Sequence, residues 1–497
     1  MERAENMVSI EHIYSYFSES TGITTDTRQC REGMMFVALR GENFDGNRYA
    51  KSALEQGCRY AVVDNAAYAD PTDERYLLVD DSLKALQQLA RHHRRTLGLP
   101  IVGITGTNGK TTTKELIAAV LSRKYHIHYT QGNLNNHIGV PLTLLQLTAE
   151  HEMAVVEMGA SHPGDIKELV EIAEPDYGLI TNVGMAHLQG FGSLEGVIRT
   201  KGEMYDYLRT TPRRTIFLNV NDKYLVNIVD GLEVVGYGQV LADVPLRASL
   251  GTPSAPLCSA RPSMNRGTVE DAALLPGDAL VQTPPLFIEG VPCKGGGVTS
   301  EARSNGTLGG DFPYLRFQWR KRGGEWHEVS TQLIGSYNID NALCAVAVGT
   351  YFGVAEQEVS AALSEYAPTN NRSQLTKTEH NTLVVDAYNA NPTSMRAAID
   401  NFALMDVPHK MLILGDMKEL GEATEAAHQE VVDLLDARDF AEVWLVGPAF
   451  AATRHTQRTF ADAEEVKAAL EAERPEGRTI LIKGSNSMKL ASLVEWL

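Results

Sequence analysis

The chain has 497 residues, which is more than a single hydrophobic core usually supports, so we expect two to four domains. Its content of 43% hydrophobic and 22% charged residues is typical of a folded globular protein and argues against a disordered or fibrous chain. The formal net charge of −18 argues against a general nucleic-acid binder; a bound phosphate must be held locally by backbone N–H groups, a few cations and metal ions.

The cysteine pattern and the hydropathy indicate a cytoplasmic protein. The five cysteines are odd in number and none stands in a CxxC pair, which disfavours a disulfide framework and a zinc site. The first residues lack the apolar core of an export signal, and no run of about 18 apolar residues occurs. We therefore expect reduced thiols, cytoplasmic localisation and no membrane span.

Short apolar strands alternate with helical stretches from about residue 25 to 98. MMFVAL, YAVVD and YLLVD have the composition of strands, and SLKALQQLARHHRRTL has helical periodicity. Next, LPIVG (99–103) predicts a buried strand that enters a glycine-rich turn, followed by a helix from about Lys110 to Arg123. Further strands at MAVVEMG and YGLITNV predict a mainly parallel sheet with helices on both faces.

Residues from about 241 to 312 break this alternation. Eight of the 20 prolines fall within 241–300, together with GGG and Ser/Thr/Asn clusters, so we expect a surface insertion. Patterning resumes with YLRFQW, HEVSTQLIG and the helix-like NIDNALCAVAVGTYFG, and a third block holds the strands TLVVD, KMLILG, EVWLVG and TILIKG. We therefore predict an α/β protein of three domains: residues 1–98, a central P-loop-type domain over 99–366, and a Rossmann-like domain over 367–497.

The segment GITGTNGKTT (103–112) predicts a phosphate-binding loop. Glycines let the backbone wrap closely around phosphates, and the N-terminus of the following helix supplies N–H donors. Lys110 would contact the β- and γ-phosphates and the Thr111 hydroxyl a Mg²⁺. Ile104 stands where the GxxxxGK[ST] pattern has its first glycine, which leaves an ordinary glycine turn as the alternative.

Two side chains at the ends of later strands could hold a metal. Glu157, in AVVEMGASH, ends one predicted strand, and His187, in LITNVGMAHL, follows another. Open α/β sheets bind ligands at the carboxyl ends of their strands, so the pair behind a phosphate loop favours a metal site. Taken singly, each has a plainer interpretation: a capping carboxylate and a structural histidine. Lys201 alone is interpreted as an ordinary helix lysine.

A series of ordered motifs covers nearly the whole chain outside 241–312 and resembles the Mur ligase family, ATP-dependent amino-acid or peptide ligases of the cell-wall pathway. The motifs are TTDTRQCREGMMFVALRGENFDGNRYA, TGTNGKTTT, GNLNNHIGVPLTLL, VVEMGASHPGDI, ITNVGMAHL, TKGEMYDYL, GSYNIDNALCA, NNRSQL, VVDAYNANPTSMRAAI, LGDMKELG and KGSNSMKL. The resemblance implies that the first domain binds a UDP sugar, that the central domain binds ATP, and that the third closes over both. Because an exposed acyl phosphate would hydrolyse, we expect this closure to precede the chemistry, with a hinge near residue 366.

The resemblance also assigns residues to the substrates. It implies that the UDP substrate is bound by Thr25, Asp26, Thr27, Arg28, Arg40, Gly41, Asp45 and Gly46; Asn47 stands where the family often has His. It implies that ATP is bound by Thr105, Gly106, Thr107, Asn108, Gly109, Lys110, Thr111 and Thr112, by the adenine-contacting Asn338 and Asn341, and by Arg372 and Asp386 of the third domain. Tyr337 stands where His is usual.

The same resemblance implies a catalytic set of Lys110, Glu157, His187 and Lys201. Mur ligases commonly carbamylate the lysine at the position of Lys201. Only a neutral amine captures CO₂, and the carbamate formed is a carboxylate that can ligate Mg²⁺. Two Mg²⁺ ions are implied, one held by Thr111 and Glu157 and the other by His187 and the carbamate of Lys201.

The run YNANP (388–392) resembles the signature of the family branch that adds D-alanyl-D-alanine to UDP-N-acetylmuramoyl-tripeptide in peptidoglycan synthesis. Tyr388, Asn389 and Asn391 are the implied substrate contacts, and Ala387 replaces a frequent Ser. Without the surrounding motifs, the run could be an ordinary turn rich in Asn and Pro. The implied reaction passes through an acyl phosphate of the tripeptide and gives the pentapeptide, ADP and phosphate.

Three alternatives remain open: the branch that adds the third amino acid, a folate polyglutamate ligase, and a nucleotide-binding scaffold that has lost catalysis. The diamino-acid signature DNPA, usual in the first of these, is absent from the sequence. The third residue of the tripeptide, diaminopimelate or lysine, also stays open, and we expect a monomer.

Overall fold

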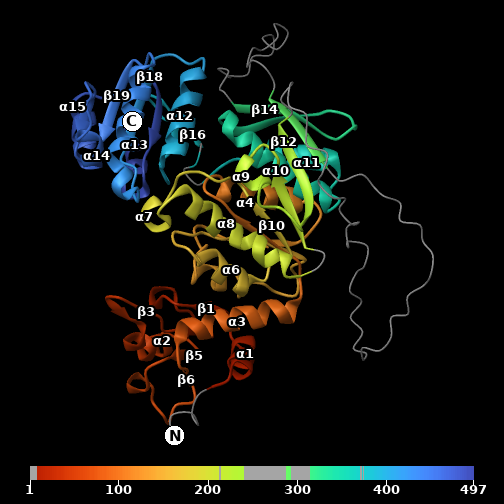
Figure 1. Ribbon diagram of the computed structural model, residues 1–497. Helices are drawn as coiled ribbons and strands as arrows, with labels where there is room; N and C mark the ends of the chain where they lie inside the picture. The colour runs from red at the N-terminus through yellow and green to blue at the C-terminus, as the bar shows by residue number, and fades with distance from the viewer. Residues whose placement is uncertain (1–7, 212–213, 240–286, 293–313, 370–371, 373) are drawn as a thin grey trace.

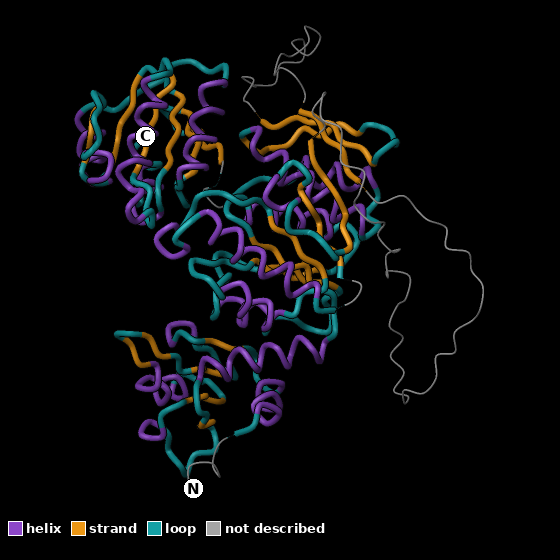
Figure 2. Tube along the Cα trace, in the orientation of Figure 1, coloured by secondary structure: helices purple, strands orange, loops and turns teal. Residues whose placement is uncertain are grey.

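The computed structural model describes residues 8–211, 214–239, 287–292, 314–369, 372 and 374–497. They form three α/β units, each built around its own sheet (Figures 1 and 2). The predicted fold class is thereby confirmed, while the exact boundaries at 98/99 and 366/367 stay predictions. In the described part of the chain, no helix combines the length and apolar character that a membrane crossing needs.

The N-terminal unit is a four-stranded parallel sheet in the order β1-β2-β5-β6. Its strands are β1 (Ile23–Thr24), β2 (Met35–Val37), β5 (Tyr60–Val63) and β6 (Tyr76–Leu78). A small hairpin, β3 (Arg40–Gly41) with β4 (Phe44–Asp45), follows β2, and the helices are α1 (Ile10–Ser18), α2 (Ala50–Glu55) and α3 (Ser82–Leu97). Asp81 caps the start of α3, and Gly98, in the left-handed region, ends it.

The central unit has nine strands in the order β15-β14-β13-β12-β11-β10-β7-β9-β8. They are β7 (Ile101–Thr105), β8 (Ile127–Tyr129), β9 (Met153–Glu157), β10 (Tyr177–Ile180), β11 (Thr215–Asn219), β12 (Glu233–Gln239), β13 (Phe287–Pro292), β14 (Tyr314–Lys321) and β15 (His327–Ile334). The sheet is parallel from β8 to β13, and β14 and β15 add an antiparallel edge.

Helices cover both faces of this sheet, as predicted. On one face α4 (Lys110–Leu121), α10 (Ile339–Tyr351) and α11 (Glu356–Glu365) share a core with Val102 and Val155. On the other face Ala154 and Val156 meet α5 (Gly139–Leu144), α6 (Asp165–Ala173) and α8 (Leu194–Arg209). Successive residues of β9 thus point to opposite cores. Because both faces of the strand are buried, its sequence is a continuous apolar run up to Glu157. The short helices are α7 (Leu188–Phe191) and α9 (Lys223–Val226).

The predicted surface insertion over 241–312 needs a correction. Residues 287–292 form β13, which pairs in parallel with β12 and antiparallel with β14 inside the central sheet. The run FIEGVP has strand character, but the dense prolines and glycines on both sides of it hid the strand. The other residues of this segment lie outside those that the structure describes.

The C-terminal unit has the strand order β16-β17-β21-β18-β19-β20, parallel except for the β16–β17 pair. The strands are β16 (Gln374–Lys377), β17 (Thr382–Asp386), β18 (Lys410–Gly415), β19 (Glu442–Val446), β20 (Arg458–Phe460) and β21 (Thr479–Lys483). Alternate strand residues point to α12 (Pro392–Leu404) and α13 (Thr424–Asp436) on one face and to α15 (Ala463–Ala472) on the other; α14 (Pro448–Ala451) follows β19.

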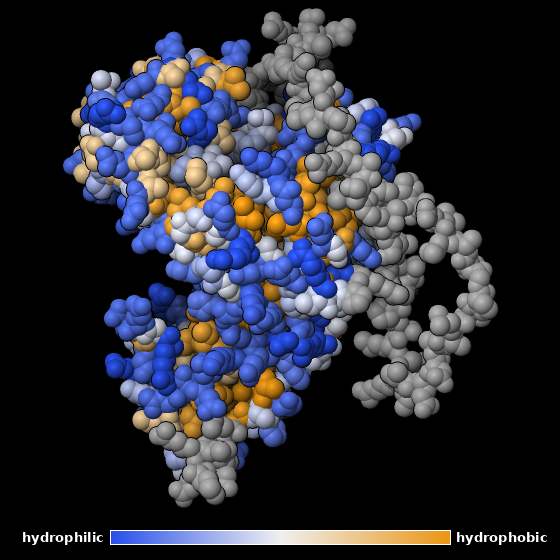
Figure 3. All heavy atoms as spheres, viewed as in Figure 1, coloured by the Kyte–Doolittle hydropathy of each residue, from blue (hydrophilic) through white to orange (hydrophobic). Residues whose placement is uncertain are grey.

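The N- and C-terminal units both contact the central unit. Helix α3 joins the N-terminal unit to it through bonds such as that from Gln87 Nε2 to Glu168 Oε1 (2.7 Å). The C-terminal unit packs near the loop before α4, where Asn391 Nδ2 donates to Asn108 Oδ1 (2.7 Å). The space-filling view shows a hollow at the left edge, between the N-terminal unit and the rest of the molecule (Figure 3).

Candidate active site

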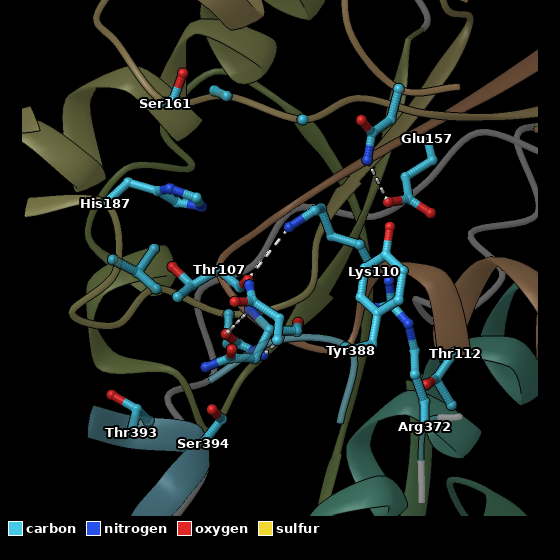
Figure 4. A pocket seen from close by; sticks show the side chains of 18 of the residues that line it. Thr107, Lys110, Thr112, Glu157, Ser161, His187, Arg372, Tyr388, Thr393 and Ser394 are labelled. Atoms are coloured by element: carbon cyan, nitrogen blue, oxygen red, sulfur yellow. Dashed lines mark hydrogen bonds between the residues drawn. The ribbon is translucent and has the colours of Figure 1, made fainter. Parts of the chain in front are cut away.

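A cavity of about 680 Å³ lies where the central unit meets the C-terminal unit. It opens over the carboxyl ends of β7, β9 and β10, where ligands bind in open parallel sheets. Most of the predicted nucleotide and metal residues line it: Thr107, Asn108, Gly109, Lys110, Thr112, Glu157, His187, Asn338, Asn341, Arg372 and Asp386. Two predicted substrate contacts, Tyr388 and Asn389, line it as well. Lys110 points into its middle, with His187 on one side and Glu157 on the other (Figure 4).

The loop between β7 and α4 can be built only with glycine at two positions. Gly106 has φ 141°, and a Cβ there would lie 2.0 Å from Thr181 Oγ1. Gly109 has φ 78°, and its Cβ would lie 2.5 Å from Asn341 Oδ1. The loop is therefore pressed against its neighbours, with its free N–H groups at the start of α4, which is the geometry that binds phosphate.

Lys110 lies at the first position of α4 and folds over this loop. Its Nζ donates to the carbonyl oxygens of Gly106 (2.8 Å) and Thr107 (3.2 Å). Burial lowers the pKa of Lys110, while the negative charge of Glu157 opposes that shift. The cation is thus positioned beside the loop that a phosphate would occupy.

The carboxylate of Glu157 ends β9 and is held on both oxygens. Thr111 Oγ1 donates to Oε2 (2.9 Å) and Asn135 Nδ2 to Oε1 (2.9 Å), while Lys114 Nζ lies 3.9 Å from Oε2. Glu157 is only 1% exposed. A carboxylate and a hydroxyl are the hard oxygen donors that suit Mg²⁺. The described residues contain no group of three or more His, Cys, Asp or Glu that could hold a metal.

His187 stands opposite Glu157, after β10, and begins α7. It has φ 50°, and its Nδ1 forms an ion pair with Glu419 Oε2 of the C-terminal unit. Burial lowers the pKa of His187, while the Glu419 charge opposes that shift. Nδ1 has no aligned hydrogen bond in spite of this contact. Where a carboxylate lies against one ring nitrogen, the other nitrogen is the one left for a ligand.

Lys201 lies in α8, behind the cavity wall rather than in it. It is 2% exposed, and its Nζ lies over the ring of Phe191, 5.3 Å from the ring centre. Burial, and then the charge of Lys110, hold the pKa of Lys201 well below its usual value. The amine is therefore neutral more readily than that of a surface lysine, as carbamylation requires.

Asn338 and Asn341 are tied into one buried chain of hydrogen bonds with α4. Thr113 Oγ1 donates to Asn341 Oδ1 (3.1 Å), Asn341 Nδ2 to Asn338 Oδ1 (2.8 Å), and Asn338 Nδ2 to the Ile334 carbonyl (2.9 Å). The pair is thus fixed relative to the loop. Tyr337 lines the same part of the cavity.

The C-terminal unit supplies the opposite wall of the cavity. The Arg372 guanidinium stacks on the Tyr388 ring at 3.9 Å from its centre. Lys483 Nζ donates to Asp386 Oδ2 (2.6 Å) and to the Asn389 carbonyl (3.1 Å), which ties the end of β17 to that of β21. Tyr388 of the YNANP turn lies close to Lys110 (Figure 4), and Asn391 of the same turn donates to Asn108 of the phosphate-type loop.

Comparison with known proteins places this arrangement in a family. Three family models match: the catalytic domain of the Mur ligase family over residues 19–94, the Mur ligase middle domain over 104–242, and the Mur ligase glutamate ligase domain over 371–486. The UDP-N-acetylmuramoyl-tripeptide–D-alanyl-D-alanine ligase of Bacillus subtilis is 32% identical, with 95% of this chain and 92% of that protein aligned. This chain belongs to the Mur ligase family.

Two further members of the family match over nearly their whole length. The ligase of the same name from Escherichia coli is 32% identical over 96% of this chain and 93% of its own. A crystal structure of MurF from Acinetobacter baumannii has a TM-score of 0.75 and 25% identity, covering 98% of both chains. The resemblance to the Mur ligase family that the sequence motifs indicated is thereby confirmed.

In this Mur ligase the predicted UDP-substrate residues lie apart from the cavity, at the carboxyl edge of the first sheet. Asp26 caps a short 3-10 helix after β1 and pairs with Arg28 (2.6 Å), while Arg40 pairs with Asp64 (2.6 Å). Thr25 and Thr27 follow β1, Gly41 and Asp45 lie in the β3–β4 hairpin after β2, and Gly46 directly follows that hairpin. None of the eight lines the cavity.

Asn47, which stands where the family often has His, has a structural role. It is 1% exposed; its Nδ2 donates to Asp45 Oδ1 (2.8 Å) and Asp64 Oδ1 (2.7 Å), and its Oδ1 accepts from the Asp64 N–H (3.0 Å). It thus joins the hairpin to the end of β5.

Several site residues were missed in the sequence. Lys114 lies one helical turn after Thr111, a spacing that places both on one face of α4. Asn135 and Lys483 stand inside quoted motifs, GNLNNH and KGSNSMKL, but neither was singled out. Glu419 also stands inside a quoted motif, LGDMKELG, but it reaches His187 from a different unit, and no local pattern could have found that contact.

Proposed function

We propose that this protein is an ATP-dependent, ADP-forming ligase that joins D-alanyl-D-alanine to UDP-N-acetylmuramoyl-tripeptide in peptidoglycan precursor synthesis. The observation that carries the proposal is that one cavity holds both the loop with Lys110 and the turn with Tyr388 and Asn389. Two relatives that are 32% identical over nearly the whole chain carry the name of this activity.

The chemistry requires a carboxylate to be activated before an amine can attack it. ATP would phosphorylate the terminal carboxylate of the tripeptide, and the amine of the dipeptide would displace phosphate from the acyl phosphate. Lys110 and the N–H groups at the start of α4 would hold the transferring phosphoryl group and neutralise its charge. Asn338 and Asn341 would contact the adenine, and Arg372 and Asp386 would reach the nucleotide from the C-terminal unit.

Two sets of side chains would hold Mg²⁺. Thr111 and Glu157 fit the first ion, and His187 with a carbamate on Lys201 would hold the second, near the tripeptide carboxylate. Bound Mg²⁺ would offset the repulsion between the triphosphate and that carboxylate. Burial of Lys201 (2% exposed) supports the carbamate, because a buried amine is readily neutral.

The remaining substrate groups fall on two surfaces. The loops after β1 and β2 would bind the UDP moiety, and Tyr388, Asn389 and Asn391 the incoming dipeptide. An acyl phosphate exposed to water would hydrolyse, so the C-terminal unit would close over the site, with a hinge near residue 366.

A ligation assay tests the proposal. Purified protein is incubated with ATP, Mg²⁺ and UDP-N-acetylmuramoyl-tripeptide, with either D-alanyl-D-alanine or a single amino acid, and phosphate and product mass are measured. The proposal predicts pentapeptide only with the dipeptide. Release of phosphate with the single amino acid alone would favour a related branch, and ATP binding without any release would favour a scaffold. Tripeptides ending in diaminopimelate and in lysine, tested side by side, decide the third residue.

A further inference from the structure

Two residues with unusual backbone conformations face each other where the C-terminal unit meets α7. His187 (φ 50°) and Glu419 (φ 64°) are two of the five non-glycine residues with positive φ in the part of the chain that the structure describes. They form an ion pair, and the Gln189 N–H donates to the Glu419 carbonyl (3.3 Å). Such conformations cost on the order of 1 kcal/mol each and cluster at functional sites. Figure 1 shows α7 beside the C-terminal unit.

The C-terminal unit holds the loop of Glu419 in place through its own core. The Met417 N–H donates to Nε2 of the fully buried His428 (3.0 Å), and the Lys418 N–H donates to Ser485 Oγ (3.0 Å). Glu419 follows directly. Its direction toward the central unit is therefore set by contacts that do not involve His187.

We propose that Glu419 is a positioning residue that turns the free nitrogen of His187 toward a cation in the cavity. Glu419 Oε2 lies against His187 Nδ1 as an ion pair, without the alignment of a hydrogen bond. Because a carboxylate oxygen can only accept, this contact favours the neutral ring with its proton on Nδ1. Nε2 then presents its lone pair. Metal-binding histidines commonly donate their second ring N–H to a carboxylate in this way, and loss of that partner costs about 10- to 100-fold in metal affinity.

The pair contributes orientation rather than stability. The side chains of His187 and Glu419 are 31% and 60% exposed, and ion pairs of this exposure contribute little to folding. Because Glu419 belongs to the C-terminal unit, His187 is oriented only while that unit is docked. Docking and cation binding are thereby coupled. This inference rests on the proposed function, since it takes His187 as a ligand of the second Mg²⁺.

The first test reads the ring of His187 directly in the full-length protein without substrates. In protein labelled with ¹⁵N-histidine, the His187 signals are assigned by their loss in His187→Gln. The proton is expected on Nδ1 in the wild type and shared between both nitrogens in Glu419→Ala. Glu422→Gln, which changes a carboxylate three residues away, is expected to keep the wild-type ring signals. An unchanged ring in Glu419→Ala would overturn the proposal.

The second test measures the cation with Mn²⁺ as the probe, by electron paramagnetic resonance. With a non-hydrolysable ATP analogue and UDP-N-acetylmuramoyl-tripeptide bound, Glu419→Ala is expected to weaken the second Mn²⁺ by about 10-fold or more, and Glu422→Gln to leave it unchanged. Tighter Mn²⁺ binding in Glu419→Ala would mean that Glu419 blocks His187, and it would overturn the proposal. Failure of the wild type to bind the UDP-tripeptide would count against the proposed function, while the ring signals still decide the role of Glu419.

Discussion

The two sides of Lys110 are built in different ways. On one side, Glu157 is 1% exposed and receives bonds from Thr111 and Asn135, all within the central unit. On the other side, His187 has a left-handed backbone and is held by a carboxylate from another unit. The proposed phosphate and Mg²⁺ groups of the nucleotide side therefore lie within the central unit, to which the C-terminal unit adds Arg372 and Asp386. On the proposed substrate side, His187 itself is held from the C-terminal unit.

This difference suits a reaction in which the activated intermediate must be kept from water. The loop before α4 and Glu157 are formed within the central unit, so they could bind the ATP phosphates before Arg372 and Asp386 reach the nucleotide. A substrate side assembled across two units becomes competent only when the cavity is covered. Substitutions on the two sides should therefore affect different measurements.

The largest effect is expected from Lys110→Met, which removes the cation at the centre of the cavity. Loss of a charged group that stabilises a transferring phosphoryl group should lower kcat by about 10³-fold. The rate of phosphate release gives kcat, and Lys84→Met, on the exposed side of α3, is the matched control. A kcat within a few fold of the wild type would remove Lys110 from the reaction.

Lys201→Ala should have the second-largest effect and lower kcat by roughly 10²-fold, because the second Mg²⁺ would lose its proposed carbamate ligand. Added formate or acetate should restore part of the activity by entering the space of the carbamate. ATP-analogue binding should stay near the wild-type value, since Lys201 does not line the cavity. Full activity without added carboxylate would exclude Lys201 from the mechanism.

Sequence alone predicted the features that depend on neighbouring residues. The helix predicted for SLKALQQLARHHRRTL is α3 (Ser82–Leu97), and the glycine-rich loop precedes α4 as expected. The strand predicted at 99–103 lies at Ile101–Thr105, because its pairing with β9 and β10 reaches Ile104 and Thr105. Local composition sets the type of element, and tertiary pairing sets its ends.

Features that depend on distant residues could not be predicted in this way. Strand β13 was hidden by the prolines around it, and its place in the sheet comes from its pairing with β12 and β14. The Lys483–Asp386 bond joins strands about a hundred residues apart, and the His187–Glu419 pair joins two units. Motifs identified the family, but only the fold reveals which side chains hold the site residues.

Asn135→Ala should affect the nucleotide side alone. It removes the bond to Glu157 Oε1 (2.9 Å) and leaves the carboxylate held only on Oε2, by Thr111 and Lys114. The Mg²⁺ concentration that half-saturates ATP-analogue binding should rise by about 10-fold, while the ring signals of His187 stay unchanged. Asn133→Ala, at an exposed position two residues earlier, is the control. A shift in the His187 signals would mean that the two sides are coupled inside the central unit.

The smallest effect is expected from Asn391→Ser, which weakens docking. Because Asn391 is also a proposed contact of the dipeptide, the KM values of ATP and of D-alanyl-D-alanine are measured separately, and a change confined to the dipeptide would indicate the substrate role instead. Asn391 caps α12 and also donates from Nδ2 to Asn108 Oδ1 (2.7 Å). Serine is an equally good N-cap but is too short to reach Asn108. Loss of one hydrogen bond, about 1 kcal/mol, should lower kcat/KM by roughly 5-fold with Tm unchanged.

The double variant Asn391→Ser/Glu419→Ala tests whether both residues act through docking. Since both substitutions weaken the same docked arrangement, the free-energy loss in the double variant should be smaller than the sum of the two single losses. Fully additive losses would show that Glu419 acts on His187 independently of docking. The Glu157 side and the His187 side of Lys110 would then be built differently, but neither would depend more than the other on closure of the C-terminal unit.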